Sequence, residues 1–169
     1  MVTTQLKHQL PCNLFGMDFL AHFGGDLDMD ALTLTLSRTE REPQEDFHPR
    51  PFLKLPLTVG QGKAVPTLFL VDTGARTYLH KSVAKERGMA LTKRPRQDNP
   101  FRCWTVQEPL SIDISDSCFR ALKGALSCEL GESTLGHKDL KRTLISFKDW
   151  SMTFRSHKGD VTIPFLRCE

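Results

Sequence analysis

One short run of residues has the clearest chemical potential in this sequence: Val71-Asp72-Thr73-Gly74-Ala75. The small residues Gly74 and Ala75 allow such a loop to approach another backbone closely, and Asp72 supplies a carboxylate. Two carboxylates that share one proton cannot both ionise, so one can act as general base on a water molecule while the other acts as general acid. The alternative interpretation is that Asp72 only caps a turn, for which Asp-Thr-Gly is also well suited.

Two predicted strands deliver this loop. Residues 52–59 alternate apolar and polar side chains, Gly60-Gln61-Gly62 is a turn signal, and residues 64–71 become almost continuously apolar. Two such segments joined by a Gly-containing turn are typical of a β-hairpin. The second strand of this hairpin ends at Asp72.

Most of the chain after the loop also has the pattern of strands, at residues 110–114, 119–130, 144–147 and 151–155. Two short helices are expected, at residues 81–87, closed by Gly88, and at residues 139–142. Many short strands with turn signals between them indicate an all-β fold.

The loop and its surroundings resemble the active site of the retropepsin-like (retroviral-type) aspartic proteases. A second element of that family is an apolar pair followed by Gly and a short helix, and it is matched by Thr134-Leu135-Gly136 and the residues up to Leu140. The segment LISFKDWSMTF (144–154) is similar to the family's terminal strands. The resemblance covers residues 52–155.

This resemblance implies a closed β-barrel or sandwich with one or two short helices and the activity of an aspartic endopeptidase derived from a retroelement. Asp72 would be the catalytic residue, and Thr73, Gly74 and Ala75 would complete the active-site loop. The Thr73 hydroxyl would bridge two such loops. Because the loop occurs once, each chain of a homodimer would give one Asp72, with the site on the twofold axis. We expect a polypeptide substrate and neither a cofactor nor a metal.

Arg76 stands where the family usually has a small hydroxyl residue that hydrogen-bonds the catalytic carboxylate. A nearby guanidinium would favour the ionised carboxylate and weaken proton sharing. In the other interpretation, Arg76 points to solvent and Thr77 supplies the hydroxyl.

The stretch that would form the family's flap, residues 96–114, contains no glycine. Asn99-Pro100 is expected to supply the turn, with Phe101 and Trp104 as apolar groups that cover the substrate. Trp104 could equally be a core residue.

The element at Gly136 also departs from the family, which usually has an acidic residue or Asn two positions after the Gly. Here that position is Lys138, and Asp139 follows it. The N-terminal run from Asn13 to Leu20 fits better, because Asp18 lies two positions after Gly16.

The chain therefore reads as closing element, linker, aspartate loop and closing element. Three explanations remain: the end of one repeat followed by a whole second one, a circular permutation completed by residues 13–36, or an N-terminal element that packs as an extra layer or on a dimer partner. We expect residues 1–36 to form the N-terminal segment, residues 37–51, which contain three prolines, to be a linker, and residues 52–169 to form the protease-like domain.

Composition restricts the remaining classes of protein. The net charge of +3 is too mild to indicate a nucleic-acid binder, and the basic loop around residues 93–96 reads as solvated. The five cysteines are odd in number and widely spaced, which argues for a reduced, cytoplasmic protein. Cys118 and Cys128 are expected to be small core residues, and we expect no membrane partner.

Two functions fit these observations. The first is a homodimeric aspartic endopeptidase in which Asp72 activates water for peptide-bond hydrolysis. The second keeps the fold without the activity, as a dimerisation or peptide-binding module, and would account for Arg76 and the glycine-free flap.

Overall fold

The computed structural model describes residues 17–37, 50–94, 103–115, 118–122, 125–129 and 131–167. Within these residues, two short helices are present, α1 (Met17–His22) and α2 (Lys81–Glu86). The strands are β1 (Asp26–Asp28), β2 (Thr33–Thr35), β3 (Phe52–Val59), β4 (Val65–Asp72), β5 (Tyr78–His80), β6 (Leu91–Lys93), β7 (Cys103–Val106), β8 (Leu110–Ser115), β9 (Cys118–Leu122), β10 (Leu126–Cys128), β11 (Thr134–Gly136), β12 (Thr143–Ser146), β13 (Ser151–Phe154) and β14 (Val161–Pro164). The predicted all-β class is confirmed.

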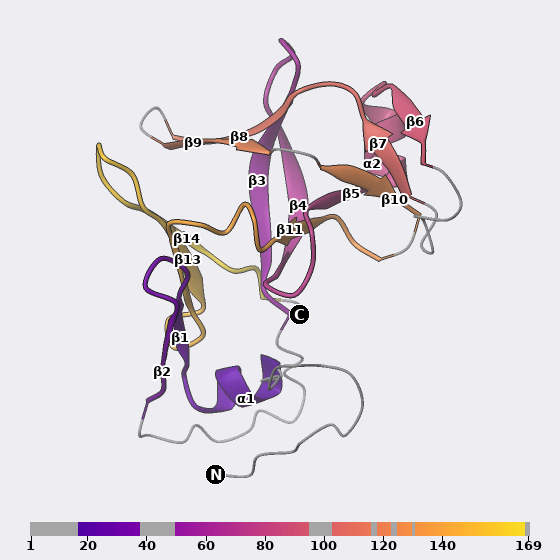
Figure 1. The fold of residues 1–169 in the computed structure, drawn as a ribbon. Coiled ribbons are helices and arrows are strands. Elements are labelled where there is room, and N and C mark those ends of the chain that lie inside the picture. Colours follow the sequence, from indigo (N-terminus) through magenta and orange to yellow (C-terminus); the bar gives the residue numbers. More distant parts are fainter. Residues whose placement is uncertain are drawn as a thin grey trace.

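The larger sheet has the strand order β6-β7-β10-β5-β11-β4-β3-β8-β9 (Figure 1). The predicted hairpin of β3 and β4 lies in the interior of this sheet, in register from Phe52 opposite Leu70 to Leu57 opposite Val65. Leu57 is fully buried, as the alternation in the sequence predicts. The order of these strands has two ends, so the described residues do not show the closed barrel that the resemblance implied.

Two parallel pairings in this sheet join segments that are distant in the sequence. β11 runs parallel to β4, and β10 runs parallel to β5. The first pairing sets Gly136 opposite Asp72. The closing element at Gly136 is therefore the one that pairs with the strand of the aspartate loop, as chain order suggested.

The smaller sheet joins the two ends of the described chain, in the order β14-β13-β12-β1-β2. Figure 1 shows the indigo N-terminal strands beside the yellow C-terminal ones. One apolar row crosses all five strands, because each member lies directly opposite the next. The row consists of Leu34, Leu27, Ile145, Met152 and Ile163.

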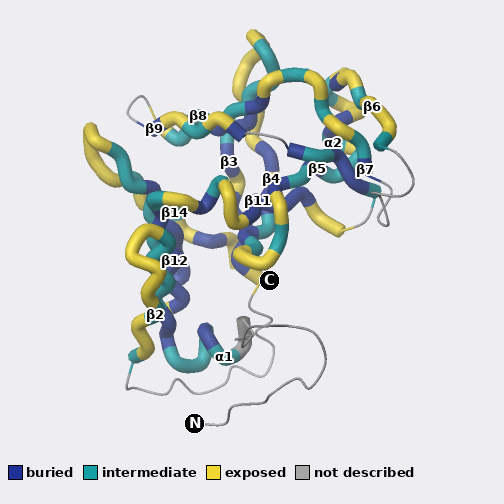
Figure 2. Tube along the Cα trace, in the orientation of Figure 1, coloured by how far each residue is buried: buried dark blue, intermediate teal, exposed yellow. Residues whose placement is uncertain are grey.

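The core is continuous between the two sheets. Figure 2 shows buried residues along β4, β11 and β12. Trp150 packs edge-on against Phe165, with ring centroids 5.3 Å apart, and also contacts Phe147. Burial of these large side chains is the main stabilising contribution of the region. None of the helices in these residues has the length and apolar character needed to span a membrane.

Several expected elements differ from the observed ones. Residues 139–142 form turns instead of a helix, and the strand predicted over residues 119–130 is divided into β9 and β10. The helix ending before Gly88 is confirmed, with Gly88 at a φ of 63°. Residues 38–49 of the predicted linker, and residues 13–16 of the N-terminal element, lie outside the described residues.

Candidate active site

The loop of interest begins at the end of β4, a strand paired on both sides by β3 and β11. Val71 is buried against Leu135, its partner on β11. Asp72 is half-buried, whereas Thr73 and Gly74 are exposed. The sheet thus fixes the base of the loop and leaves its tip open to other molecules.

The Asp72 carboxylate takes part in the turn that follows it. The Gly74 amide donates a hydrogen bond of 2.8 Å to Oδ1, and the Ala75 amide donates one of 3.3 Å to the Asp72 carbonyl. A carboxylate that accepts a bond two residues ahead forms an Asx turn, as the turn-cap interpretation predicts. The same bond fixes the orientation of the carboxylate, so it is compatible with a catalytic role as well.

Gly136 allows the loop and β11 to approach closely. A Cβ atom at this position would lie 2.3 Å from the Arg76 carbonyl carbon and 2.5 Å from the Ala75 oxygen. Backbone atoms at these distances leave no room for a Cβ, so only glycine fits at this position. The sequence analysis identified this residue from the family pattern, and the structure gives the physical reason for it.

A buried hydroxyl connects the loop to the segment after β11. Thr77 donates a hydrogen bond to Asp139 Oδ2, and its oxygen accepts one of 2.9 Å from the Gly136 amide. Burial raises the pKa of Asp139 above its ordinary value, although the bond from Thr77 acts in the opposite direction. Asp139 therefore supplies the acidic group near this glycine, three positions after it instead of two.

His137 adds a second connection. Its backbone amide and its ring Nδ1 both reach the Ala75 carbonyl, at 3.0 and 2.8 Å. A carbonyl only accepts, so Nδ1 carries the hydrogen. The sequence analysis did not assign this residue a role, and no pattern in the sequence marks it apart from its position next to Gly136.

Arg76 is exposed, in agreement with the interpretation that it points to solvent. The second half of that interpretation is wrong. The single hydrogen of the Thr77 hydroxyl is donated to Asp139 and is not available to the Asp72 carboxylate.

Of the two residues proposed to cover a substrate, Phe101 and Trp104, the structure describes only Trp104. Phe101 lies outside the described residues. Trp104 is partly exposed on β7, and the Lys81 ammonium lies 3.7 Å from the centre of its ring. Lys81 also forms a 2.5 Å ion pair with Glu129. Whether Trp104 covers a substrate stays a prediction.

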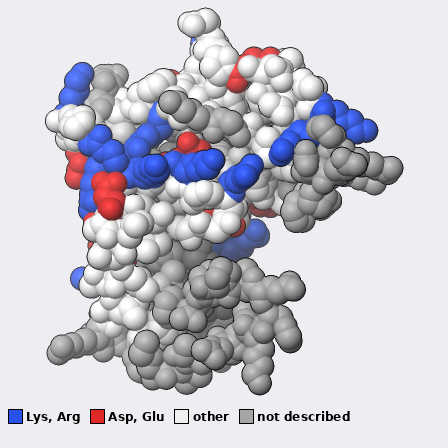
Figure 3. Space-filling view, viewed as in Figure 1, with Lys and Arg blue, Asp and Glu red and all other residues white. Residues whose placement is uncertain are grey.

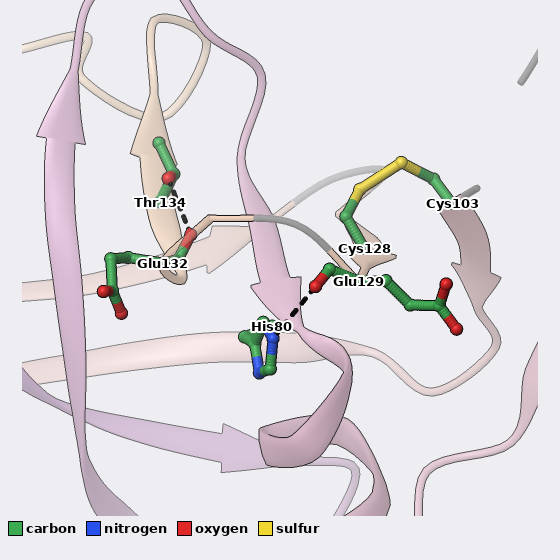
Figure 4. Close-up of a disulfide and its surroundings, with 6 residues drawn as sticks. All are labelled: His80, Cys103, Cys128, Glu129, Glu132 and Thr134. Atoms are coloured by element: carbon green, nitrogen blue, oxygen red, sulfur yellow. Dashed lines mark hydrogen bonds between the residues drawn. A yellow bond between two sulfur atoms is a disulfide. The ribbon is translucent and has the colours of Figure 1, made fainter. Parts of the chain in front are cut away.

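A disulfide joins Cys103 of β7 to Cys128 of β10 (Figure 4). The two residues are direct partners in the antiparallel pairing of these strands. Cys128 is buried, as expected of a small core residue, but its disulfide contradicts the reduced state that the cysteine spacing suggested. Linear spacing does not show which strands become neighbours. Cys118 is free and buried, as expected.

His80 is the last residue of β5 and the N-cap of α2. Its Nε2 lies 3.2 Å from the Glu129 carbonyl, as Figure 4 shows, and its Nδ1 accepts from the Ser82 amide at the start of α2. The side chain thus caps a helix and contacts the strand end after Cys128. This is a structural role.

Similarity to known proteins is found in the structure and not in the sequence. The fold is similar to the crystal structure of the retroviral protease-like domain of Ddi1 from Leishmania major, with a TM-score of 0.45 and 20% sequence identity, over 69% of this chain and 94% of that chain. No protein-family model matches the sequence. No curated protein matches it either. A likeness at this level does not show to which family the chain belongs.

Proposed function

We propose that this chain is one half of an aspartic endopeptidase, in which two copies each give one Asp72 to a shared site. The most direct argument for this proposal is the way in which the fold holds the Asp72 loop. Its base is held by an interior strand of a sheet and its backbone is in close contact with Gly136, while its tip stays exposed. This combination suits a carboxylate that must meet a second one at a fixed geometry.

The chemistry follows from the pairing of the carboxylates. With one proton shared between two Asp72 side chains, the ionised one would remove a proton from a water molecule. The protonated one would polarise the peptide carbonyl and later donate its proton to the leaving amine. Activity should therefore fall on both the acidic and the alkaline side of an optimum, and both limbs would belong to the pair. An extended polypeptide is the proposed substrate, and Trp104 is a candidate for covering it.

Cleavage of an unstructured protein between pH 4 and 7 tests this proposal. The rate should rise more steeply than linearly with chain concentration, because the site forms by association, and Asp72→Asn should lower it at least a thousandfold. Asp160→Asn, an exchange at an exposed position, is the matched control. Absence of cleavage in samples that sedimentation shows to be dimeric would favour the alternative, a peptide-binding or dimerisation module without activity.

A further inference from the structure

The hairpin of β1 and β2 and the hairpin of β12 and β13 are two copies of one element. A shift of 118 residues, the difference between positions 27 and 145, superposes their backbone features. Gly24 and Arg142 both have positive φ, of 56° and 58°, and so do Leu32 and Trp150, of 53° and 51°. Left-handed backbone is uncommon outside glycine, so two matching pairs indicate one shared backbone path.

The turns of the two hairpins are also closed in the same way. In the first, the Asp28 carboxylate accepts a 3.0 Å hydrogen bond from the Ala31 amide. In the second, the Ser146 hydroxyl accepts a 3.0 Å bond from the Asp149 amide. Asp28 and Ser146 are equivalent under the same shift, as are the two donors.

The two copies pair about a local twofold axis. Leu27 lies directly opposite Ile145, its own equivalent, and Asp26 and Asp28 lie opposite Ser146 and Leu144. The flanking bonds obey the same symmetry. The Met29 amide donates to the Thr143 carbonyl at 3.0 Å, and the Phe147 amide donates to the Gly25 carbonyl at 2.8 Å.

This symmetry means that β12 offers an edge to which a second β12 could bind in the same manner. The proposed function requires two copies related by a twofold axis, and an axis at Ile145 would relate the two Asp72 loops as well. In the structure, however, that edge of β12 is already covered by β1 of the same chain (Figure 1).

Polar contacts strengthen the internal pairing. Arg155 binds the Asp28 carboxylate with both terminal nitrogens, at 3.0 and 2.7 Å. The Ser146 hydroxyl donates to Asp26 at 2.6 Å, and the Arg142 amide donates to Asp30 at 2.8 Å. Segments tethered by a short linker compete at an effective concentration of about a millimolar. A second chain at micromolar concentration would displace the segment only if it bound about a thousandfold better.

We propose that residues 17–37 occupy the place of a second copy's 143–154 hairpin and so prevent two chains from pairing their Asp72 loops until this segment is displaced. The inference concerns regulation of the proposed site and rests on the proposed function. Displacement of the segment would free the β12 edge for the second copy. Association and activity would then appear together.

A full-length variant that weakens the segment tests the inference. Leu27→Lys together with Leu34→Lys places two charges in the apolar row without altering β12. By sedimentation, we expect its dimer dissociation constant to be at least tenfold lower than that of the wild type. The matched control, Leu32→Lys with Thr33→Lys, adds the same charges at exposed positions of the same segment and should behave as wild type. A folded double variant that stays as monomeric as the wild type overturns the inference.

Cross-linking shows which surfaces pair, even if the charged variant does not fold. Asp26→Cys with Ser146→Cys should form a bond within one chain, because these residues lie opposite each other. Covalent dimers from this variant would overturn the inference, since they would place the segment on another chain. In a dimer formed through β12, a cysteine at position 145 would face its own copy across the axis. Ile145→Cys should therefore give covalent dimers when it is combined with Leu27→Lys and Leu34→Lys, and none when it is the single exchange. Covalent dimers from the single exchange would also overturn the inference.

Two readouts separate this inference from the proposed function. A charged variant that dimerises without cleaving peptide would leave the role of residues 17–37 intact and overturn the protease proposal. A wild-type chain that dimerises and cleaves as readily as the charged variant would leave the protease proposal intact and overturn the role of the segment.

Discussion

Gly136 lies where the Asp72 loop has no room for a side chain. In Gly136→Ala, the new Cβ would meet backbone atoms of Arg76 and Ala75, so the loop or β11 must move. We expect the free energy of unfolding to fall by about 3 kcal/mol, at the upper end for an overpacked site. Urea denaturation measures this change. Gly60→Ala is the control, because a new Cβ at Gly60 would have no atom within 4 Å. Gly60 has a φ of 56°, so this exchange should cost about 1 kcal/mol through backbone strain alone.

Thr77 can be tested by removal of its hydroxyl alone. Thr77→Val keeps the shape of the side chain but leaves the Asp139 carboxylate without its donor and the Gly136 amide without its acceptor. We expect a loss of about 2 kcal/mol in stability, together with weaker cleavage because the loop is less well held. Thr162→Val, which removes a hydroxyl paired with Thr153 at an exposed position, should change stability by less than about 0.5 kcal/mol. Equal losses in the two variants would contradict the bracing role.

Asp139 should also make stability depend on pH. Burial raises its pKa in the folded chain above the ordinary 3.8, so the folded state keeps the proton to higher pH than the unfolded state does. This contribution is fully present below pH 3.8 and is lost as the pH rises through the raised pKa. In Asp139→Asn, this part of the pH dependence should disappear from urea midpoints measured between pH 4 and 7. An unchanged profile would show that Asp139 does not titrate differently in the two states.

At the scale of elements, the bond between β7 and β10 holds the outer part of the larger sheet. Cys103 and Cys128 are 25 residues apart, and a loop of that size reduces the entropy of the unfolded chain. Cys103→Ser with Cys128→Ser should therefore lower the free energy of unfolding by about 3 kcal/mol. The wild type in reductant should show the same loss, and so should Cys118→Ala, which keeps the bond. The double serine variant should not respond to reductant. A wild type that is equally stable in both conditions would contradict this bond.

The attachment of the N-terminal hairpin should depend on pH in the opposite sense to Asp139. Hydrogen bonds from Arg155 lower the pKa of Asp28 well below its ordinary value of 3.8, and Arg155 is itself held more strongly protonated. Stability from this ion pair is present above pH 3.8 and is lost as the pH falls below it. Asp28→Asn should be less stable at neutral pH and should lose less on acidification, as measured by thermal unfolding between pH 5 and 2. Asp160→Asn is the control.

The elements that the sequence predicts well are those with a local cause. The hairpin of β3 and β4 follows from alternation and a glycine turn, and α2 ends where Gly88 adopts positive φ. β5 and β7 were not predicted, because three or four residues carry too little periodicity. β5 pairs with β10 and β11, and β7 pairs with β6 and β10. The existence of β5 and β7 therefore depends on tertiary pairing.

At the scale of the whole molecule, the sequence marked a candidate aspartate loop and two candidate closing elements but not their mutual arrangement. Asp72, Gly136 and the motif around Gly16 were marked by their resemblance to the pattern of a known family. The pairing of β1 with β12 could not be predicted, because a short strand's partner is decided by tertiary contacts. The contact of Thr77 with Asp139 was missed for a similar reason, since the acidic residue stands one position later than the motif expects.

On the face of the molecule that Figure 3 shows, the charge is mixed. Figure 3 shows Lys and Arg side chains across the middle of one face, with Asp and Glu beside them. This agrees with the mild net charge of +3, and we retain the expectation that nucleic acid is not a partner. A cytoplasmic location remains a proposal. Because Cys103 and Cys128 form a disulfide, the stability of the protein should be measured under reducing conditions as well.

The opposition of Leu27 and Ile145 has a consequence for how this chain can evolve. Each of these residues is the other's neighbour across the local axis, so neither can change in volume without affecting the fit of its counterpart. Two copies of one ancestral hairpin would begin with the same residue at both positions and could then diverge only in compensating steps. A library randomised at the two positions together should therefore retain folded members with a nearly constant summed side-chain volume, whatever the individual residues.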